Sequence, residues 1–444
     1  EKIRKNVLRS LRSLKLNTEI IIPKNVPPNY FIKAQKILLE INSIKSLINY
    51  KLKDGYPLFI FYDAILKKEF VGEINIDHPT IKIELGKTLF MLDFYKNEIL
   101  KKKYNAIILS HPTTIRFSTL LWIGLSYNIP VYILNYRHNF ITIRYHKNIN
   151  DFKKLGSDIC DYSDILKLSE NKINLLRAKG KEYVNQISNN KKTEISIYRG
   201  SSNAVINNKE NFLLQFNALN KPTILILSNC FPDFPNANGL SYLENHIDWI
   251  KITLENAIKI KEYNWIFKKH PAEHLYGQKT TLKKVIKKYL CDNIFYTDNK
   301  LNHKDLINYS DCVVTSVGSA GYELTAMGKR VIMARESSMS SWNFVNFAKN
   351  KNHYEELLKN APFIELPNKN EIQKASIYAC LLNTTPKDFA NGYKYSFGRY
   401  GYKIWKGLDQ FIKINKMNFL EEEKLIEKWI NSRKFSYNSF KNLN

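Results

Sequence analysis

The chain has 444 residues, with 68 Lys and Arg against 41 Asp and Glu, which gives a formal net charge of +27. Hydrophobic residues make up 44% of the chain, which excludes a mainly disordered protein, and the length predicts two to three domains of roughly 100–200 residues each. The five cysteines are scattered without a CxxC pair, which favours a reducing compartment over a disulfide framework or zinc site, and no apolar run approaches the roughly 20 residues that span a bilayer.

The positive charge suits three kinds of partner: a nucleic acid, an anionic membrane surface or a small anionic substrate. Part of the excess is compositional, because Lys, Ile, Asn and Tyr are all abundant. A basic surface gains roughly 1 kcal/mol per Lys or Arg beside anionic lipid. No nucleic-acid-binding module is recognisable, so we expect a membrane surface and an anionic substrate, and no nucleic acid, as partners.

The N-terminal part of the chain is expected to be helical and basic over residues 1–50. The apolar run Pro57–Tyr62 predicts a short buried strand that ends at Asp63. Ligands of parallel sheets gather at the carboxyl ends of strands, so Asp63 is a candidate cleft residue, although a turn or cap role is the simpler interpretation.

A βαβ unit follows, with a strand over 106–109, a helix over about 114–127 and a strand over 131–134. Such a unit requires a parallel pair of strands. His111 follows the first of these strands and Arg137 lies just beyond the second, so both are further candidate cleft residues.

The polar residues 189–192 and 201–209 predict a linker. Beyond it, apolar runs alternate with helical patterns, which predicts a Rossmann-like, doubly wound sheet. The strands are expected at 223–227, 264–268, 293–296, 311–315 and 331–334.

The small residues of Ser316–Gly321, between a predicted strand and a helix, form the clearest chemical motif. Free backbone N–H groups and the positive end of the helix dipole suit a phosphate, and Ser316 and Ser319 add hydroxyl donors. Glu323 lies on the first helical turn. There it either accepts hydrogen bonds from ribose hydroxyls or only stabilises the start of the helix through its negative charge. The motif is neither a P-loop nor GxGxxG, so a P-loop kinase and a dinucleotide oxidoreductase are disfavoured.

Lys268, Lys269 and His270 end a predicted strand and make an anion-binding edge. His270 can donate a hydrogen bond or a proton to a leaving phosphate; a structural histidine is the alternative. Asp233 sits between two prolines in the loop after the first strand of this domain, where it is either a nucleophile or base or simply a turn residue.

Lys-His-Pro after the second strand, with Ser-x-Gly-Ser-x-Gly-Tyr-Glu-Leu-x-x-x-Gly-Lys-x-Val-Ile later, resembles bacterial capsule and lipopolysaccharide glycosyltransferases of the GT-B fold. The similarity is greatest to the capsule type that uses CMP-activated ulosonic acids such as Kdo, and it covers roughly residues 220–345. It implies an α/β, GT-B architecture of two Rossmann-like domains that face a central cleft. The implied domains are 1–215 for the acceptor, 216–400 for the donor, and C-terminal helices over 401–444 that cross back to the first domain.

The resemblance also implies roles for individual residues. His270 would contact the donor phosphate, Asp233 would be the nucleophile of a retaining enzyme, and Asp63 would be the base of an inverting one. Glu323 would bind the ribose, and a basic group would bind the ulosonate carboxylate. The implied donor-binding residues are Lys268, Lys269, Ser316, Gly318, Ser319, Gly321, Glu323 and Arg335.

The implied partners are a nucleotide-sugar donor, a glycan or glycolipid acceptor and an anionic membrane surface, with no metal and no cofactor. The implied location is cytoplasmic, at the inner face of the bacterial inner membrane. Rival enzymes are a teichoic-acid-like CDP-polyol phosphotransferase and a UDP-sugar GT-B transferase, and the rival of another class is a basic nucleic-acid-binding protein. The sugar, the acceptor, the linkage, the stereochemistry and the oligomeric state stay open.

Overall fold

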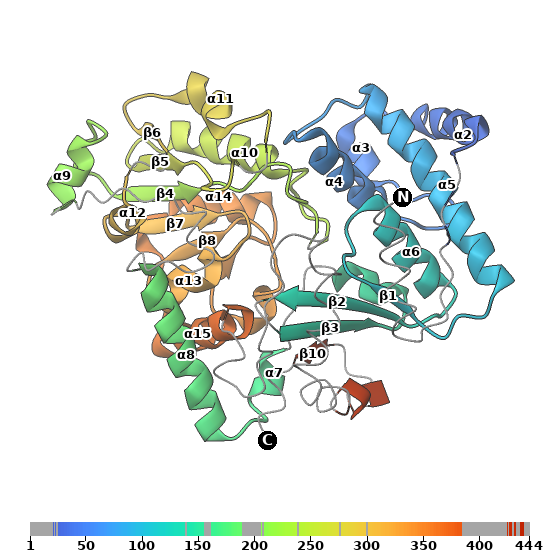
Figure 1. Cartoon of the computed structure of the whole chain (residues 1–444). Coiled ribbons are helices and arrows are strands. Elements are labelled where there is room, and N and C mark those ends of the chain that lie inside the picture. The colour runs from blue at the N-terminus through green and yellow to red at the C-terminus, as the bar shows by residue number, and fades with distance from the viewer. Residues whose placement is uncertain are drawn as a thin grey trace.

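The computed structural model places most of the chain in two α/β domains that lie side by side (Figure 1). It describes residues 21, 23, 25–137, 140–154, 161–188, 206, 208–237, 239–274, 277–298 and 301–383, and near the C-terminus 424, 426–428, 430–431 and 436–438. The α/β class and the two-domain, GT-B-type arrangement that the sequence predicts are confirmed. Among the described residues, no helix is both long enough and apolar enough to cross a membrane.

The second domain is built on a six-stranded sheet in which every neighbouring pair of strands is parallel. The strands, in the order in which they lie in the sheet, are β6 (Ile294–Thr297), β5 (Asn264–Lys268), β4 (Thr223–Leu227), β7 (Cys312–Thr315), β8 (Val331–Met333) and β9 (Asn346–Phe347). Numbered along the domain this order is 3-2-1-4-5-6, which is the Rossmann order. All five predicted strands are therefore confirmed, and a short sixth strand is added.

Helices cover both faces of this sheet, which explains why its strands are almost continuously apolar. They are α10 (His246–Lys259), α11 (Leu282–Ile286), α12 (His303–Asn308), α13 (Ala320–Ala326), α14 (Lys351–Lys359) and α15 (Lys369–Asn383). Helix α10 begins where Asn245 accepts hydrogen bonds from the N–H groups of Ile247 and Asp248, both at 2.9 Å.

The first domain has a smaller, mixed sheet in the order β1-β2-β3-β10. Its elements are α2 (Pro28–Leu38), α3 (Ile44–Asn49), α4 (Leu58–Glu69), α5 (Pro79–Lys101), β1 (Ile107–Leu109), α6 (Ile115–Ser126), β2 (Val131–Arg137) and β3 (Phe140–His146). The predicted βαβ unit is confirmed, since β1 and β2 are parallel with α6 between them. Strands β2 and β3 form an antiparallel hairpin that the sequence analysis did not predict.

The predicted strand over Pro57–Tyr62 is wrong, because these residues open helix α4. The helix buries eight of its 12 residues, so its apolar positions show neither the helical nor the strand period. Pro57 precedes the helix, and Phe70 ends it in the left-handed conformation at φ 57°. Asp63 therefore lies in the middle of a buried helix and not at the end of a strand.

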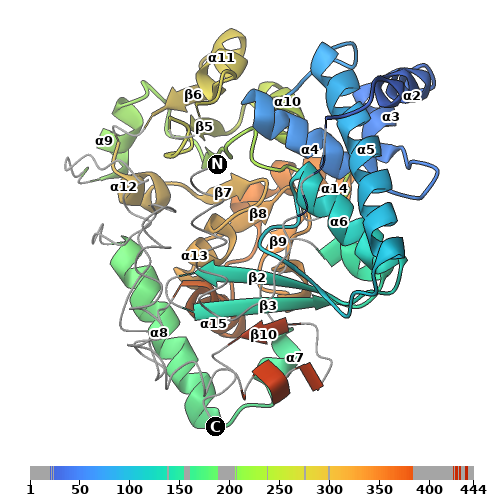
Figure 2. The same ribbon diagram turned by 45° about the vertical axis from the view of Figure 1, so that its right-hand side comes forward.

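Two segments pack against elements that are distant from them in the sequence. Helix α8 (Glu170–Ser188) packs on α15 of the second domain so closely that a Cβ atom on Gly180 would lie 1.8 Å from the Ser376 carbonyl oxygen. Strand β10 (Ser436–Asn438) pairs antiparallel with β3 in the first sheet (Figure 2). Shorter elements are η1 (Ile149–Lys154), α7 (Tyr162–Ile165) and α9 (Lys209–Leu214).

Several sequence predictions fall outside the described residues. The helix over 403–414 and nearly all of the linker lie there, and so does most of the basic segment at the N-terminus. The helix over 419–432 is described only at residues 424, 426–428 and 430–431, which are helical. Ile426 packs against Ile143 of β3. The domain boundaries stay predictions.

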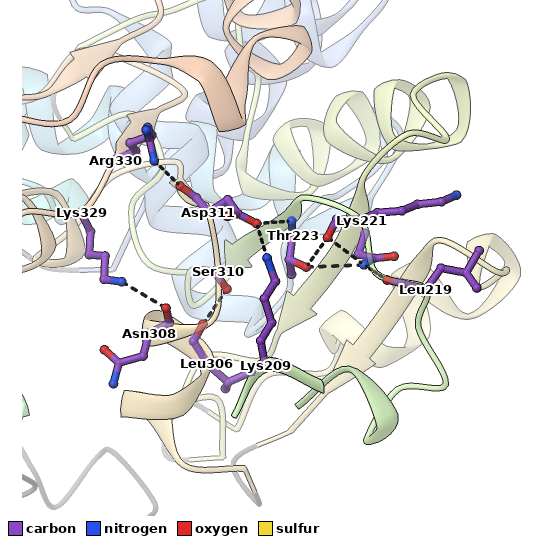
Figure 3. Close-up of polar contacts among 11 residues, drawn as sticks. Lys209, Leu219, Lys221, Thr223, Leu306, Asn308, Ser310, Asp311, Lys329 and Arg330 are labelled. Atoms are coloured by element: carbon purple, nitrogen blue, oxygen red, sulfur yellow. Dashed lines mark hydrogen bonds and ion pairs between the residues drawn. The ribbon is translucent and has the colours of Figure 1, made fainter. Parts of the chain in front are cut away.

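At the amino end of the second sheet, Asp311 joins several elements (Figure 3). One carboxylate oxygen accepts the N–H of Thr223 at 2.8 Å and Lys209 Nζ at 3.3 Å. Arg330 donates to the Asp311 carbonyl oxygen at 3.5 Å. Asp311 thus satisfies a backbone donor at the start of β4 and attaches α9 to the sheet.

We expect Asp311→Ala to lower the free energy of unfolding by about 1–2 kcal/mol, because the Thr223 N–H loses its acceptor. Asp311→Asn keeps an acceptor oxygen and should lose less, since an exposed ion pair such as that with Lys209 contributes only about 0–1 kcal/mol. Urea unfolding measures the loss of stability in both variants. Equal losses would contradict the role of Asp311 as the acceptor of the Thr223 N–H.

Candidate functional site

Three neighbouring strands of the second sheet, β5, β4 and β7, end at one edge, and the segments that follow them are joined by hydrogen bonds. The N–H of Ser228 donates to the Lys268 carbonyl oxygen at 3.1 Å. The side-chain amide of Asn229 donates to the Val317 carbonyl oxygen at 2.8 Å. The structure therefore brings together the two motifs that the sequence singles out, Lys268–His270 and Ser316–Gly321, with the Ser228–Cys230 segment between them.

His270 is partly buried at this edge. Its Nδ1 accepts the N–H of Ala272 at 3.1 Å and lies 3.0 Å from the Cys230 sulfur. Burial raises the pKa of the Cys230 thiol to about 12, so the sulfur keeps its proton near neutral pH. Because Nδ1 is an acceptor, a neutral His270 carries its proton on Nε2 and is a hydrogen-bond donor there.

The Ser316–Gly321 loop has an exposed part and a buried part. Gly318 and Ser319 are exposed, and Gly318 has a φ of +132°, which residues with a side chain rarely adopt. Ser316 is fully buried. Gly321 has a packing role, because a Cβ atom there would lie 2.8 Å from the Met333 sulfur. Gly318 and Ser319 are therefore the residues of this loop that a ligand can reach directly.

Buried polar atoms without a partner gather at the same edge. Within the described part of the chain, Ser228 Oγ, Asn229 Oδ1 and Ser316 Oγ are buried and have no hydrogen-bond partner. Each such group costs about 1–3 kcal/mol of stability, and native folds keep few of them. The sequence analysis missed Ser228, Asn229 and Cys230, although their position after a predicted buried strand was a usable signal.

Glu323 is buried on α13, where the Tyr183 hydroxyl of α8 donates to it at 3.4 Å. Lys268 is also buried, whereas Lys269 is partly buried and donates its N–H to the Thr297 carbonyl oxygen at 3.1 Å. The side chain of Arg137, at the end of β2, lies outside the described residues. Glu323 and Lys268 are thus held inside the fold, while Lys269 is nearer the surface.

Asp233 lies in the loop after β4, where this loop faces the first domain. Its carboxylate is ion-paired with Lys67 of α4 at 2.8 Å, and its side chain is 43% exposed. The ring of the next residue, Phe234, contacts the His111 ring at a centroid distance of 5.8 Å. The structure therefore brings two predicted cleft residues, Asp233 and His111, to the same contact between the domains.

Asp63 faces the same loop but is only 1% exposed. One carboxylate oxygen accepts the N–H of Asn236 at 2.6 Å, and the other accepts the Asn236 side-chain amide at 2.9 Å. Burial raises the pKa of Asp63 to about 7, although the Asn236 hydrogen bonds and the charge of Arg335 act the other way. Asp63 joins the two domains.

Arg335 is buried beside this loop and donates to the carbonyl oxygens of Pro235 and Gly239, the latter at 2.6 Å. Burial lowers the pKa of Arg335 to about 10. Burial, together with the charges of Arg335 and His270, lowers the pKa of His246 to about 3. Arg335 thus holds the loop in place, and its guanidinium faces loop carbonyl groups.

No group of three or more His, Cys, Asp or Glu side chains within the described ranges is placed to hold a metal ion. The residues that gather at the strand ends instead combine exposed backbone of Gly318 and Ser319 with basic side chains and an imidazole donor. Such a set is suited to an anionic, phosphate-bearing ligand.

No family model matches the sequence, and no curated protein sequence does. Solved structures with some similarity include KpsC from Thermosulfurimonas dismutans, a beta Kdo 2,4 transferase, at 12% identity and a TM-score of 0.36, over 61% of this chain and 78% of that one. MnaA from S. aureus, solved with UDP, has 12% identity and a TM-score of 0.29, over 68% of this chain and 78% of that one. UDP-GlcNAc 2-epimerase from Neisseria meningitidis, bound to UDP-GlcNAc, has 14% identity and a TM-score of 0.27, over 67% of this chain and 81% of that one. All three TM-scores lie below 0.5, and no functional conclusion follows from them.

We expect the buried Asp63 carboxyl to make stability depend on pH. The pKa of Asp63 is higher in the folded state than in the unfolded state, where it is about 3.9. The contribution of Asp63 to the free energy of unfolding is therefore fully present below about pH 3.9 and is lost as the pH rises through about 7. The free energy of unfolding of the wild type, relative to that of Asp63→Asn, should therefore fall by up to about 4 kcal/mol between pH 4 and pH 7.5.

Urea unfolding at a series of pH values measures this difference. Asp233→Asn is the matched control, because it removes an exposed carboxylate from the same contact and should leave the pH profile close to that of the wild type. Parallel profiles for the wild type and Asp63→Asn would contradict the prediction.

Proposed function

We propose that the protein is a glycosyltransferase that moves an ulosonic acid of the Kdo, pseudaminic or sialic type from a CMP-activated donor to a surface polysaccharide or lipid-linked glycan. One observation carries the proposal. Asn229 and Cys230, consecutive residues after β4, contact Val317 and His270 respectively. These contacts support the proposal, because they join the Ser316–Gly321 loop and His270 to the same strand-end segment.

In the proposed donor site, the N–H groups and hydroxyl of Gly318–Ser319 bind the phosphate of CMP, and His270 donates from Nε2 to a phosphate oxygen. Ser316 supports this loop from inside the fold. Lys269, with Lys268 behind it, supplies positive charge for the ulosonate carboxylate. Arg335 is a weaker candidate for that role, because two of its nitrogens already donate to loop carbonyl groups.

We propose a retaining reaction with Asp233 as nucleophile. Its carboxylate attacks the anomeric carbon and forms a glycosyl ester as the bond to the CMP phosphate breaks and CMP leaves. An acceptor hydroxyl then attacks the same carbon, the ester bond to Asp233 breaks, and the hydroxyl proton passes to water. Asp63 is disfavoured as the base of an inverting reaction, because both of its oxygens accept hydrogen bonds inside the domain contact. We propose that protein groups, with no metal or cofactor, neutralise the leaving CMP.

Nucleotide release from a panel of donors tests the proposal. The panel holds CMP-Kdo, CMP-sialic acid, CMP-pseudaminic acid, CDP-glycerol and UDP-sugars, and we expect release of CMP from a CMP-ulosonic acid. Activity only with CDP-glycerol would favour the polyol-phosphate alternative, and activity only with a UDP-sugar would favour the other rival. Binding of nucleic acid with a steep salt dependence and no nucleotide release would contradict the enzyme.

We expect His270→Ala to lower turnover about 100- to 1,000-fold, because one preorganised donor to the leaving phosphate is lost. His274→Ala, at an exposed histidine of the same loop, is the matched control and should keep wild-type turnover. Turnover is measured with the best donor of the panel, and thermal melting checks that both variants fold. Near-normal turnover of His270→Ala would remove His270 from the mechanism.

We expect Asp233→Ala to lose transfer and the wild-type product to retain the anomeric configuration of the donor. NMR of the product gives that configuration. Lys67→Ala removes only the ion-pair partner and should cost less than Asp233→Ala. An inverted product would rule out Asp233 as the nucleophile.

We further propose that the protein works in the cytoplasm at the inner face of the bacterial inner membrane, where lipid-linked acceptors are found. The support for this is the net charge of +27, of which the proposed donor site uses only a few residues.

A further inference from the structure

The first domain carries a pocket of about 480 Å³ between helices α5 and α6 and the start of β1. Its walls are mainly apolar and aromatic, with Phe94, Ile99, Tyr104, Ile107 and Leu120 among them. Helix α5 runs along the side of this domain that faces away from the six-stranded sheet (Figure 1). The pocket is therefore separate from the proposed donor site.

Cationic side chains stand beside this apolar pocket. Lys101, Lys102 and Lys103 are exposed and lie in the chain between two lining residues, Ile99 and Tyr104. Arg116, also exposed, lines the pocket from α6. Glu98, the one carboxylate among the lining residues, is ion-paired with Lys101 at 2.9 Å.

An exposed apolar side chain also lies next to the pocket in the sequence. Leu100, which follows the lining residue Ile99 on α5, is 63% exposed. Ile21 also lines the pocket, and the sequence ahead of it alternates basic and apolar residues. An apolar pocket with cations at its side and exposed apolar neighbours has the chemistry of a lipid surface on which the headgroups are anionic.

We propose that this pocket takes an acyl chain of an anionic phospholipid, with Lys101–Lys103 and Arg116 beside the headgroup phosphates, and so docks the first domain on a membrane. Each lysine close to such a surface contributes about fivefold to partitioning, and each buried methylene about fourfold. The inference rests on the membrane location proposed above and deepens it by naming the surface and the ligand class. It concerns neither the donor nor the reaction, so it would survive a change of donor.

Co-sedimentation of the full chain with vesicles tests the headgroup contact. We expect binding to vesicles of phosphatidylglycerol and phosphatidylcholine and little binding to phosphatidylcholine alone. Replacing Lys101, Lys102 and Lys103 together by Gln should weaken binding about 10- to 100-fold. The matched control replaces Lys283, Lys284 and Lys287 of the second domain by Gln, which makes the same change of charge, and should bind nearly as the wild type does.

Dodecyl phosphate below its micelle concentration tests the pocket itself by calorimetry. The wild type should bind it at least 10-fold more tightly than inorganic phosphate, and Ala106→Trp, which fills the pocket from an exposed lining residue, should lose most of that preference. Thermal melting checks that the variant folds.

Three results would overturn the proposal: equal loss of vesicle binding in the two lysine triples, unchanged binding of dodecyl phosphate by Ala106→Trp, or binding of a prenyl phosphate without binding of vesicles. Nucleotide release by the variant that replaces Lys101, Lys102 and Lys103 should equal that of the wild type. The donor panel and the vesicle assay can therefore fail independently of each other.

Discussion

One buried carboxylate, Asp63 of helix α4, ties the first domain to the second through the asparagine that it binds. Asp63 accepts two hydrogen bonds from Asn236 in the loop after β4, and Arg335 donates to carbonyl oxygens of the same loop. This loop also carries Asn229, Cys230 and Asp233. Because hydrogen bonds from both domains hold the loop, the residues at the strand ends take defined positions relative to the first domain.

Burial of a carboxylate is costly unless hydrogen bonds and a nearby opposite charge offset it. At Asp63 the Asn236 hydrogen bonds and the charge of Arg335 offset this cost only in part, because the pKa stays raised, at about 7. The strand ends a few residues away are different, because the buried oxygens of Ser228, Asn229 and Ser316 have no partner among the described residues. Both places therefore lower the stability of the fold, one through a carboxylate whose burial is only partly offset and the other through polar atoms without a partner. This pattern is typical of a site prepared for a ligand.

The large positive charge has more than one use. Some cations are structural: Lys209 is paired with Asp311, and Lys329 donates to the Asn308 carbonyl oxygen at 3.3 Å. Others are exposed beside apolar surface, as Arg116 is at the pocket of the first domain. The net charge alone does not distinguish these cases, because it does not tell which lysines lie near a carboxylate in the folded chain.

The sequence by itself determined the second domain, because strands buried on both faces appear as short apolar runs between helices, and the residues just after them mark the carboxyl edge of the sheet. It identified His270 and the Ser316–Gly321 loop for this reason. Only the tertiary structure decided that Leu58–Glu69 is a helix, because an element buried on nearly all sides has no hydrophobic period. It also decided the partner of Asp63, which lies 173 residues away, and the packing of α8 on α15. Such contacts depend on how the domains meet, and no local pattern records that.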